Sequence, residues 1–173
     1  NILAAGQSSY LTNYAHYPVY ENTETEYYPL GDVWFEHFIE ELKKAEHYIF
    51  MEYFIISEGY LWDTVLEILK EKAAAGVDVR LIYDDFGCVT TLPCQYYKSL
   101  QQMGIKCAAF NQFRPVLNVI LNNRDHRKIA VIDGHTAFTA LILRTNTLTA
   151  RSGSATGRIP ESVCMVRRYG VLR

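Results

Sequence analysis

His126, Lys128 and Asp133 are the residues of this chain whose types and spacing could do chemistry, because they form the pattern H-x-K-x4-D. A neutral imidazole can attack phosphorus, and an ammonium group two residues away can hold the phosphate oxygens while negative charge builds in the transition state. This chemistry requires no metal ion. The pattern therefore predicts a phosphodiester site with His126 as nucleophile and Lys128 as phosphate ligand.

The apolar run Ile129–Ile132 joins the lysine to the aspartate, and its β-branched residues predict a buried strand that begins near His126 and closes at Asp133-Gly134. Alternation along a strand directs the side chains of His126 and Lys128 to the same side. Asp133 lies an odd number of residues from both, so on a regular strand it faces the other side. We interpret Asp133 as a structural or orienting carboxylate, and its direct participation stays open.

Alternatively, His126, Arg127 and Lys128 are basic residues at the start of a strand with no catalytic role, since a lone H-x-K is common. The aspartate at the right distance, the apolar run before it and the lead-in Asn122-Asn123-Arg124-Asp125 all favour the catalytic interpretation. With these features the stretch resembles the signature of the phospholipase D superfamily, which is H-x-K-x4-D.

The resemblance to bacterial cardiolipin synthases is closer, and it covers most of residues 10 to 139. The strings that carry it are Tyr53-Phe54-Ile55-Ile56, Gly76-Val77-Asp78-Val79-Arg80, Tyr83-Asp84-Asp85-Phe86-Gly87 and Asn123-Arg124-Asp125-His126-Arg127-Lys128. The resemblance implies transfer of a phosphatidyl group from one phosphatidylglycerol to another with release of glycerol. It also implies a phosphatidyl-histidine intermediate on His126.

In that family two such domains, each with one HKD set, face one another across one active site, and the second histidine protonates the leaving alcohol. The resemblance therefore implies that this chain holds the first domain and lacks the second motif. We expect little or no synthase activity from the chain alone. The alternative is a single-motif phosphodiesterase or nuclease that completes its site as a homodimer.

Composition is typical of one globular domain, with 173 residues, 49% of them hydrophobic, and a net charge of −2. That charge argues against a broad basic surface, so no nucleic-acid partner is expected. The resemblance implies phosphatidylglycerol and membrane lipid as partners, at the cytoplasmic face of the cell membrane. No apolar run is long enough to span a bilayer. The first residue is Asn1 and not Met, which suggests that the chain is truncated at its N-terminus.

No metal ion or cofactor is expected. The chain has four cysteines, Cys88, Cys94, Cys107 and Cys164. They form no C-x-x-C pair, which predicts reduced thiols and not a disulfide framework or a zinc site. Asp84 and Asp85 could bind metal or act as an acid–base pair. However, paired carboxylates after a strand are more often turn and cap residues, and no His or Cys at ligand spacing joins them.

The elements around the motif follow from hydrophobic periodicity. After an extended lead-in over 1–30, the sequence predicts helices over 32–47, 61–75 and 93–103 and strands over 48–56, 77–83 and 105–110. Glu52 interrupts an apolar strand, so it lies either on a solvent face or, as the resemblance implies, inside the fold, where it orients active-site groups. The expected fold is α/β, a mixed sheet flanked by helices on both faces, in a phospholipase D-like domain over 31–139, the first of the usual two and incomplete.

The sequence changes character after Thr139, where 140–173 contains six arginines, one acid and no lysine. The family continues here with a sequence similar to G-x-N-L-A-D-E-Y-I-N. Allowed codons for Ala140 to Thr149, preceded by one G and read from that base, encode G-L-N-L-A-D-E-Y-I-N. We therefore expect 140–173 to be a frame-shift product, non-native or disordered. The alternative is a genuine Arg-rich tail, which would suit an anionic surface.

Overall fold

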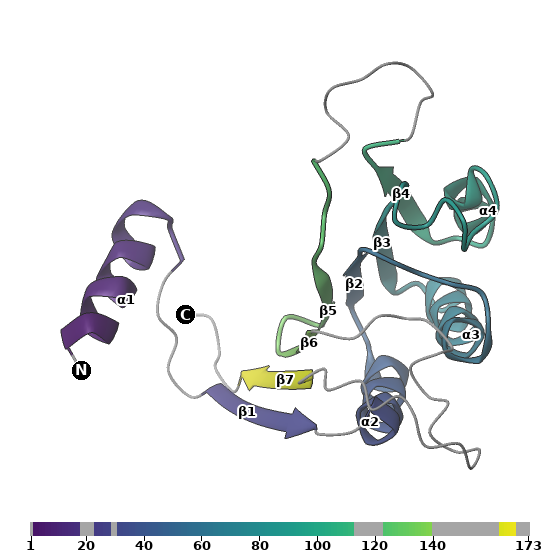
Figure 1. The fold of residues 1–173 in the computed structure, drawn as a ribbon. Coiled ribbons are helices and arrows are strands. Elements are labelled where there is room, and N and C mark those ends of the chain that lie inside the picture. Colours follow the sequence, from purple (N-terminus) through teal and green to yellow (C-terminus); the bar gives the residue numbers. More distant parts are fainter. Residues whose placement is uncertain (1, 18–22, 29–30, 113–122, 140–162, 169–173) are drawn as a thin grey trace, which may run out of the picture.

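The structure, a computed structural model, describes residues 2–17, 23–28, 31–112, 123–139 and 163–168 (Figure 1). In chain order, the elements are α1 (Ile2–Tyr14), β1 (Thr23–Tyr28), α2 (Gly31–Lys44), β2 (Tyr48–Tyr53), α3 (Tyr60–Ala74), β3 (Asp78–Asp84), α4 (Tyr96–Gln102), β4 (Lys106–Phe110), β5 (Lys128–Ile132), β6 (Thr136–Thr139) and β7 (Val163–Arg168).

The described strands form one mixed sheet in the order β1-β7-β6-β5-β2-β3-β4. Strand β2 runs parallel to β3, and β3 runs parallel to β4. Strand β5 lies on the other side of β2 and runs antiparallel to it. The predicted α/β fold with a mixed sheet is therefore confirmed, as is the parallel β2-α3-β3 unit.

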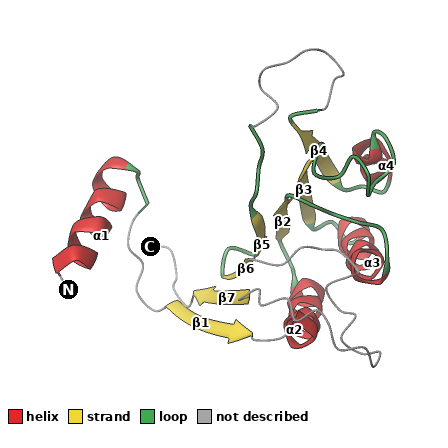
Figure 2. Ribbon diagram, in the orientation of Figure 1, coloured by secondary structure: helices red, strands yellow, loops and turns green. Residues whose placement is uncertain are grey.

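Helices α2, α3 and α4 pack on one face of this sheet, where the prediction placed helices on both (Figure 2). Alternate strand residues such as Ile49, Leu81 and Ala130 are buried against these helices. The reason lies in the strand order, because β2, β3 and β4 follow one another in a single direction. Right-handed crossovers between successive parallel strands then leave α3 and α4 on the same side.

The aromatic stripe of α2 belongs to the core, as its helical spacing predicts. Trp34 and Phe38 are fully buried, and Phe38 meets Phe138 of β6 edge-on, with ring centroids 5.1 Å apart. Asp32 lies in the first turn of this helix and Lys43 and Lys44 lie in its last turn, a charge distribution that suits its dipole. This packing ties strand β6 to the helical layer.

The N-terminal segment differs from the predicted extended lead-in, because it holds helix α1 and strand β1. None of the residues of α1 is buried. Helix α1 contains no proline, and a helix satisfies its backbone groups locally without an amphipathic pattern. Among the described residues, no helix combines the length and apolar character needed to cross a bilayer.

Part of the Arg-rich segment 140–173 is described, and that part is strand β7. It pairs antiparallel with β1 on one side and with β6 on the other. Without β7, strand β6 would present unpaired backbone N–H and C=O groups, and such groups provide a template for pairing with another strand. The remainder of the segment, including Ala140 to Thr149, lies outside the described residues.

Candidate functional site

The segment 123–127 enters β5 beside the carboxyl ends of β2 and β3. The backbone N–H of Phe54, just after β2, donates to the carbonyl of Arg127 over 3.1 Å. The N–H of Asp125 donates to the Asp84 carboxylate, at the end of β3, over 3.2 Å. Strand β5 itself begins at Lys128, slightly later than predicted. His126 and Lys128 therefore lie at the edge of the sheet where the parallel strands end, a common position for ligand sites in α/β folds.

His126 and Lys128 meet on one aromatic side chain, that of Phe54. The imidazole of His126 stacks on the Phe54 ring, with centroids 3.9 Å apart and an interplanar angle of 19°. Lys128 Nζ lies 5.6 Å from the same centroid and donates to the His126 carbonyl over 2.7 Å. Because stacking engages the face of the imidazole, the two ring nitrogens point along the ring plane, away from Phe54. His126 is exposed and Lys128 half-buried.

Asp133 lies at the other end of β5, roughly 17 Å along the strand from Lys128. Its carboxylate accepts backbone N–H groups of Glu46, His47 and Tyr48 over 2.8, 2.9 and 2.7 Å. Burial would raise the pKa of Asp133, but these amide donors lower it below the usual value. The structure therefore brings His126 and Lys128 together, and it places Asp133 as an anchor for the start of β2.

A second carboxylate, that of Asp84, holds the lead-in to the motif. Asp84 is fully buried. One oxygen accepts the Gly87 N–H over 2.8 Å and lies 3.5 Å from Arg124 Nη1, and the other accepts the Asp125 N–H. Asp84 thus caps a turn, as the sequence indicates, and it also links that turn to the segment that precedes His126.

Glu52 contacts the same segment from the middle of the sheet. Its Oε1 lies 3.5 Å from Arg127 Nε, which in turn donates to Asp125 Oδ1 over 3.2 Å. A hydrogen bond to Asp125, then burial, then the charge of Asp125 raise the pKa of Glu52 to about 7, against the opposing charge of Arg127. Of the two interpretations of Glu52, the structure favours the one in which it bonds groups next to the motif.

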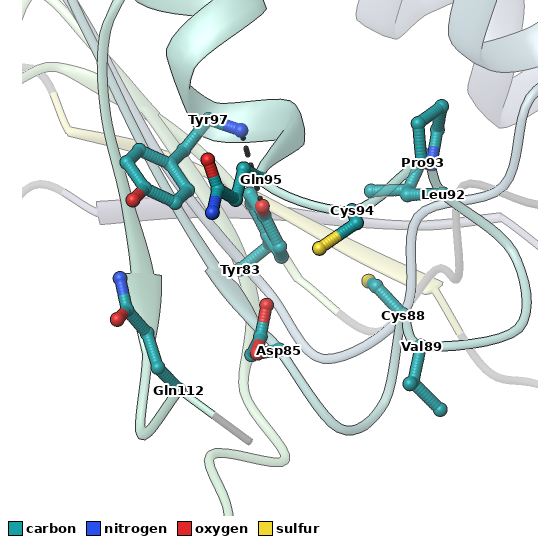
Figure 3. A pocket seen from close by; sticks show the side chains of 10 residues that line it. All are labelled: Tyr83, Asp85, Cys88, Val89, Leu92, Pro93, Cys94, Gln95, Tyr97 and Gln112. Atoms are coloured by element: carbon teal, nitrogen blue, oxygen red, sulfur yellow. Dashed lines mark hydrogen bonds between the residues drawn. The ribbon is translucent and has the colours of Figure 1, made fainter. Parts of the chain in front are cut away.

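A cavity of about 340 Å³ opens beside α4, separate from the motif (Figure 3). It is lined by Tyr83, Asp85, Cys88, Val89, Leu92, Pro93, Cys94, Gln95, Tyr97 and Gln112. The backbone N–H of Tyr97 donates to the Tyr83 hydroxyl over 3.2 Å. Burial raises the pKa of the Cys88 thiol to about 11, which disfavours the reactive thiolate. Within the described part of the chain, no cluster of His, Cys, Asp or Glu is arranged to hold a metal ion.

Sequence reasoning from the motif missed the support that Phe54, Asp84 and Asp125 give to His126. Each of them lies in one of the strings on which the family resemblance rests, and that membership is the signal by which they could have been found. The chemistry of an individual phenylalanine or aspartate gives no such indication.

The family model described as "Cardiolipin synthase, PLD-like domain" matches residues 38–142. The chain is 44% identical over 131 residues to an uncharacterized protein of Streptococcus mutans serotype c, which covers 76% of this chain and 28% of that protein. It is 38% identical over 117 residues to cardiolipin synthase 2 of Bacillus anthracis, which covers 67% of this chain and 23% of that protein. The chain thus spans about a quarter of the length of these relatives.

A solved structure shares the fold at low sequence identity. It is Nuc from Salmonella typhimurium, described as a phospholipase D family member. The TM-score is 0.54 and the sequence identity 16%, over 84% of this chain and 82% of that chain. One unit of this fold therefore makes up most of that protein.

Proposed function

The chain belongs to the cardiolipin synthase family of phospholipase D-like domains, and from this we propose that it is the first catalytic half of a phosphatidyltransferase that converts two phosphatidylglycerols into cardiolipin and glycerol. The observation that carries the proposal is the placement of His126 and Lys128 on the ring of Phe54. A nucleophile and a cation that contact the same aromatic ring can act on the same phosphate group.

In the first step, a ring nitrogen of His126 attacks the phosphorus of phosphatidylglycerol. The bond from phosphorus to the glycerol oxygen breaks, and that oxygen takes a proton from an acid supplied by a second HKD set. Lys128 holds the phosphate oxygens, whose negative charge it balances in the transition state. The product of the step is a phosphatidyl-histidine.

In the second step, a hydroxyl group of another phosphatidylglycerol attacks the same phosphorus. The hydroxyl proton passes to the group that acted as acid, the bond from phosphorus to His126 breaks, and cardiolipin leaves. Both steps use one acid–base group besides His126. The sequence contains one H-x-K-x4-D motif, so we infer that the chain turns over only when a second motif-bearing domain completes the site.

Mixing the purified chain with a separately expressed second HKD domain of a family member tests this proposal. Phosphatidylglycerol vesicles should yield cardiolipin and glycerol with the mixture and not with either part alone. His126→Ala in the chain should abolish the product. Cardiolipin formation by the chain alone, lost on His126→Ala, would refute the requirement for a second domain. Failure of the mixture in which both parts are folded would count against the transferase.

The second candidate is a single-motif phosphodiesterase that works as a homodimer, and the similarity to Nuc favours it because one unit of this fold covers 82% of that chain. Two copies of His126 would then supply nucleophile and acid. Cleavage of bis(p-nitrophenyl) phosphate or DNA that persists in EDTA and rises with the square of protein concentration would identify this function.

We further propose that the site works at the cytoplasmic face of the cell membrane, where phosphatidylglycerol is presented.

A further inference from the structure

Three charged side chains other than His126, Lys128 and Asp133 meet beside His126: Glu52 of β2, and Asp125 and Arg127 of the segment before β5. We call these three residues the carboxyl clasp. Arg127 Nε lies 3.5 Å from Glu52 Oε1 and donates to Asp125 Oδ1 over 3.2 Å. The backbone N–H of Arg127 donates to the same Asp125 oxygen over 3.1 Å. The phosphatidyl-transfer mechanism above uses none of the three.

The clasp and the proposed nucleophile lie on opposite sides of one extended segment. Strand register pairs Glu52 with Ile129 and Tyr53 with Lys128, so odd-numbered residues of this segment share the face of Glu52. Asp125 and Arg127 flank His126 in the sequence, and both are bonded on that face. Because side chains alternate along an extended backbone, His126 is directed to the opposite side of this segment from Asp125 and Arg127. Its ring stacks on Phe54, the residue that follows β2.

Glu52 is the fixed member of the clasp. It lies in β2, which is hydrogen-bonded to β3 on one side and to β5 on the other. Residues 123–127, by contrast, are outside any strand. A contact from an inner strand to both neighbours of His126 restricts this segment more than contacts within the segment itself can.

We propose that Glu52 is a positioning residue of the site: by holding Asp125 and Arg127 on the two sides of His126, it keeps the imidazole stacked on Phe54. The use of that orientation for attack on phosphorus rests on the proposed function. The positioning itself does not, because it concerns only the contacts within this chain.

The protonation state of Glu52 supports this role. Its hydrogen bond with Asp125 and its burial raise the pKa of Glu52 to about 7, while the bonds from Glu52 and Arg127 lower the pKa of Asp125 despite burial. Glu52 therefore carries a proton through the mildly acidic range and donates it to the Asp125 carboxylate. A protonated acid bound to a carboxylate forms a charge-assisted hydrogen bond.

The other charged groups on the flanking strands that share this face are Asp78, Arg80 and Asp84 of β3. Arg80 binds Asp78 over 2.6 Å, and Asp84 binds Gly87, Asp125 and Arg124. The residue of β5 opposite Glu52 is Ile129, and the residue of β3 opposite it is Ile82. The titration of Glu52 is therefore governed by Asp125 and Arg127.

Proton NMR of the complete chain labelled at histidine tests the positioning. The Phe54 ring current should shift the His126 ring protons upfield, and Glu52→Ala should remove at least half of that shift. Glu52→Gln should keep it, because an amide can donate to Asp125 and accept from Arg127. Glu67→Ala, an exposed carboxylate on α3 paired with Lys70, is the matched control and should change nothing.

His37 serves as the folding reporter, because its ring lies 5.2 Å from that of Tyr28. A wild-type His126 shift in a Glu52→Ala chain whose His37 signal is unchanged would overturn the proposal. If Glu52→Ala fails to fold, Arg127→Ala, whose side chain is 66% exposed, carries the test. Retention of the ring-current shift in that variant would equally overturn it.

A pH profile separates positioning from a merely structural role. In the wild type, the pH profile of the His126 signal should include a step from Glu52 near its pKa of about 7, and Glu52→Gln should remove that step. A profile that is the same in both chains would contradict the proposal. If the wild-type chain mixed with a second HKD domain shows no phosphatidyl transfer, but the expected NMR changes are seen in the variants, the proposed function is overturned and the positioning role stays in place.

Discussion

The ring contact between His126 and Phe54 sets the geometry of the site at the scale of single residues. Stacking at 3.9 Å fixes the plane of the imidazole, and the lysine ammonium lies over the same ring. Cations are attracted to the face of an aromatic ring. One uncharged side chain therefore orients both motif residues that would contact phosphate.

We expect Phe54→Ala to lower the rate of phosphatidyl transfer by about tenfold or more, because a nucleophile that leaves its near-attack orientation loses much of its rate. The measurement is the initial rate of cardiolipin formation by the chain mixed with a second HKD domain. Val89→Ala removes an exposed apolar side chain (52% exposed) elsewhere at this edge of the sheet and should keep the wild-type rate. An unchanged rate in Phe54→Ala would show that the stack does not orient His126.

The raised pKa of Glu52, from an ordinary value of 4.5 to about 7, predicts how stability depends on pH. Between these values the folded chain binds more protons at Glu52 than the unfolded chain does. The contribution of this group is therefore fully present below about pH 4.5 and is lost as the pH rises to about 7. Urea unfolding across that window should show this fall in wild type, and Glu52→Gln should remove it. The contribution of Asp125, whose pKa is lowered, depends on pH in the opposite direction. It is lost as the pH falls, at lower pH than the change from Glu52. An equal slope in both chains would contradict the prediction.

At the scale of elements, the site depends on two loops that are tied to strands by buried or partly buried carboxylates. Asp84 ties the turn after β3 to the segment before β5. Asp133, with a left-handed φ of 49°, ties the end of β5 to the start of β2. Both ends of the motif strand are therefore fixed to neighbouring strands by side chain–backbone bonds.

Asp133→Ala should lower the free energy of unfolding by about 2–4 kcal/mol, because it leaves the N–H groups of residues 46–48 without their charged acceptor. Urea unfolding measures the loss. Asp133→Asn retains one acceptor oxygen and should lose less. A cost below about 0.5 kcal/mol would show that water replaces the carboxylate without penalty.

Gly87→Ala should displace Phe54, because a Cβ at this position would clash with the Phe54 carbonyl oxygen and lie 3.0 Å from its ring. We expect a cost of about 1–3 kcal/mol in unfolding free energy and loss of the upfield shift of His126. Gly6→Ala, which meets nothing within 4 Å, should be neutral or slightly stabilising because it lies in helix α1. Wild-type stability and His126 shift in Gly87→Ala would disprove this coupling.

At the scale of the whole molecule, the described helices α2, α3 and α4 cover one face of the sheet. The other face carries the half-buried Phe50 and the exposed Ile82, and Arg80 lies over the Phe50 ring at 4.9 Å. The family match ends at residue 142, close to the point where the composition of the sequence changes. The end of the family match and the change in composition both bear on the origin of residues 140–173.

We propose that residues from about Ala140 arise from a frame change equivalent to one lost base. Sequencing the encoding DNA from the Phe138 codon onward should show that the restored frame encodes G-L-N-L-A-D-E-Y-I-N and continues to a second H-x-K-x4-D. A DNA sequence whose other frames lack that peptide would refute the frame change. In that case strand β7, which pairs with β1 and β6, would be a native part of this sheet.

The sequence by itself determined the motif, the order of the central helices and strands, and the shared side of His126 and Lys128. These features follow from spacings between near neighbours along the chain, where strand and helix periodicities act. The resemblance in the strings around them indicated the family, which the match over 38–142 confirms.

Only the tertiary structure decided which side chains support the motif. The donors to Asp133 lie more than 80 positions away in the sequence. The contacts of Phe54 with His126 and of Glu52 with Arg127 join β2 and the residue after it to the segment before β5. Such contacts depend on the register between two strands that are far apart in the chain. A shift of one residue in that register would turn every side chain of β5 to the opposite face, and no local pattern in the sequence specifies which register is formed.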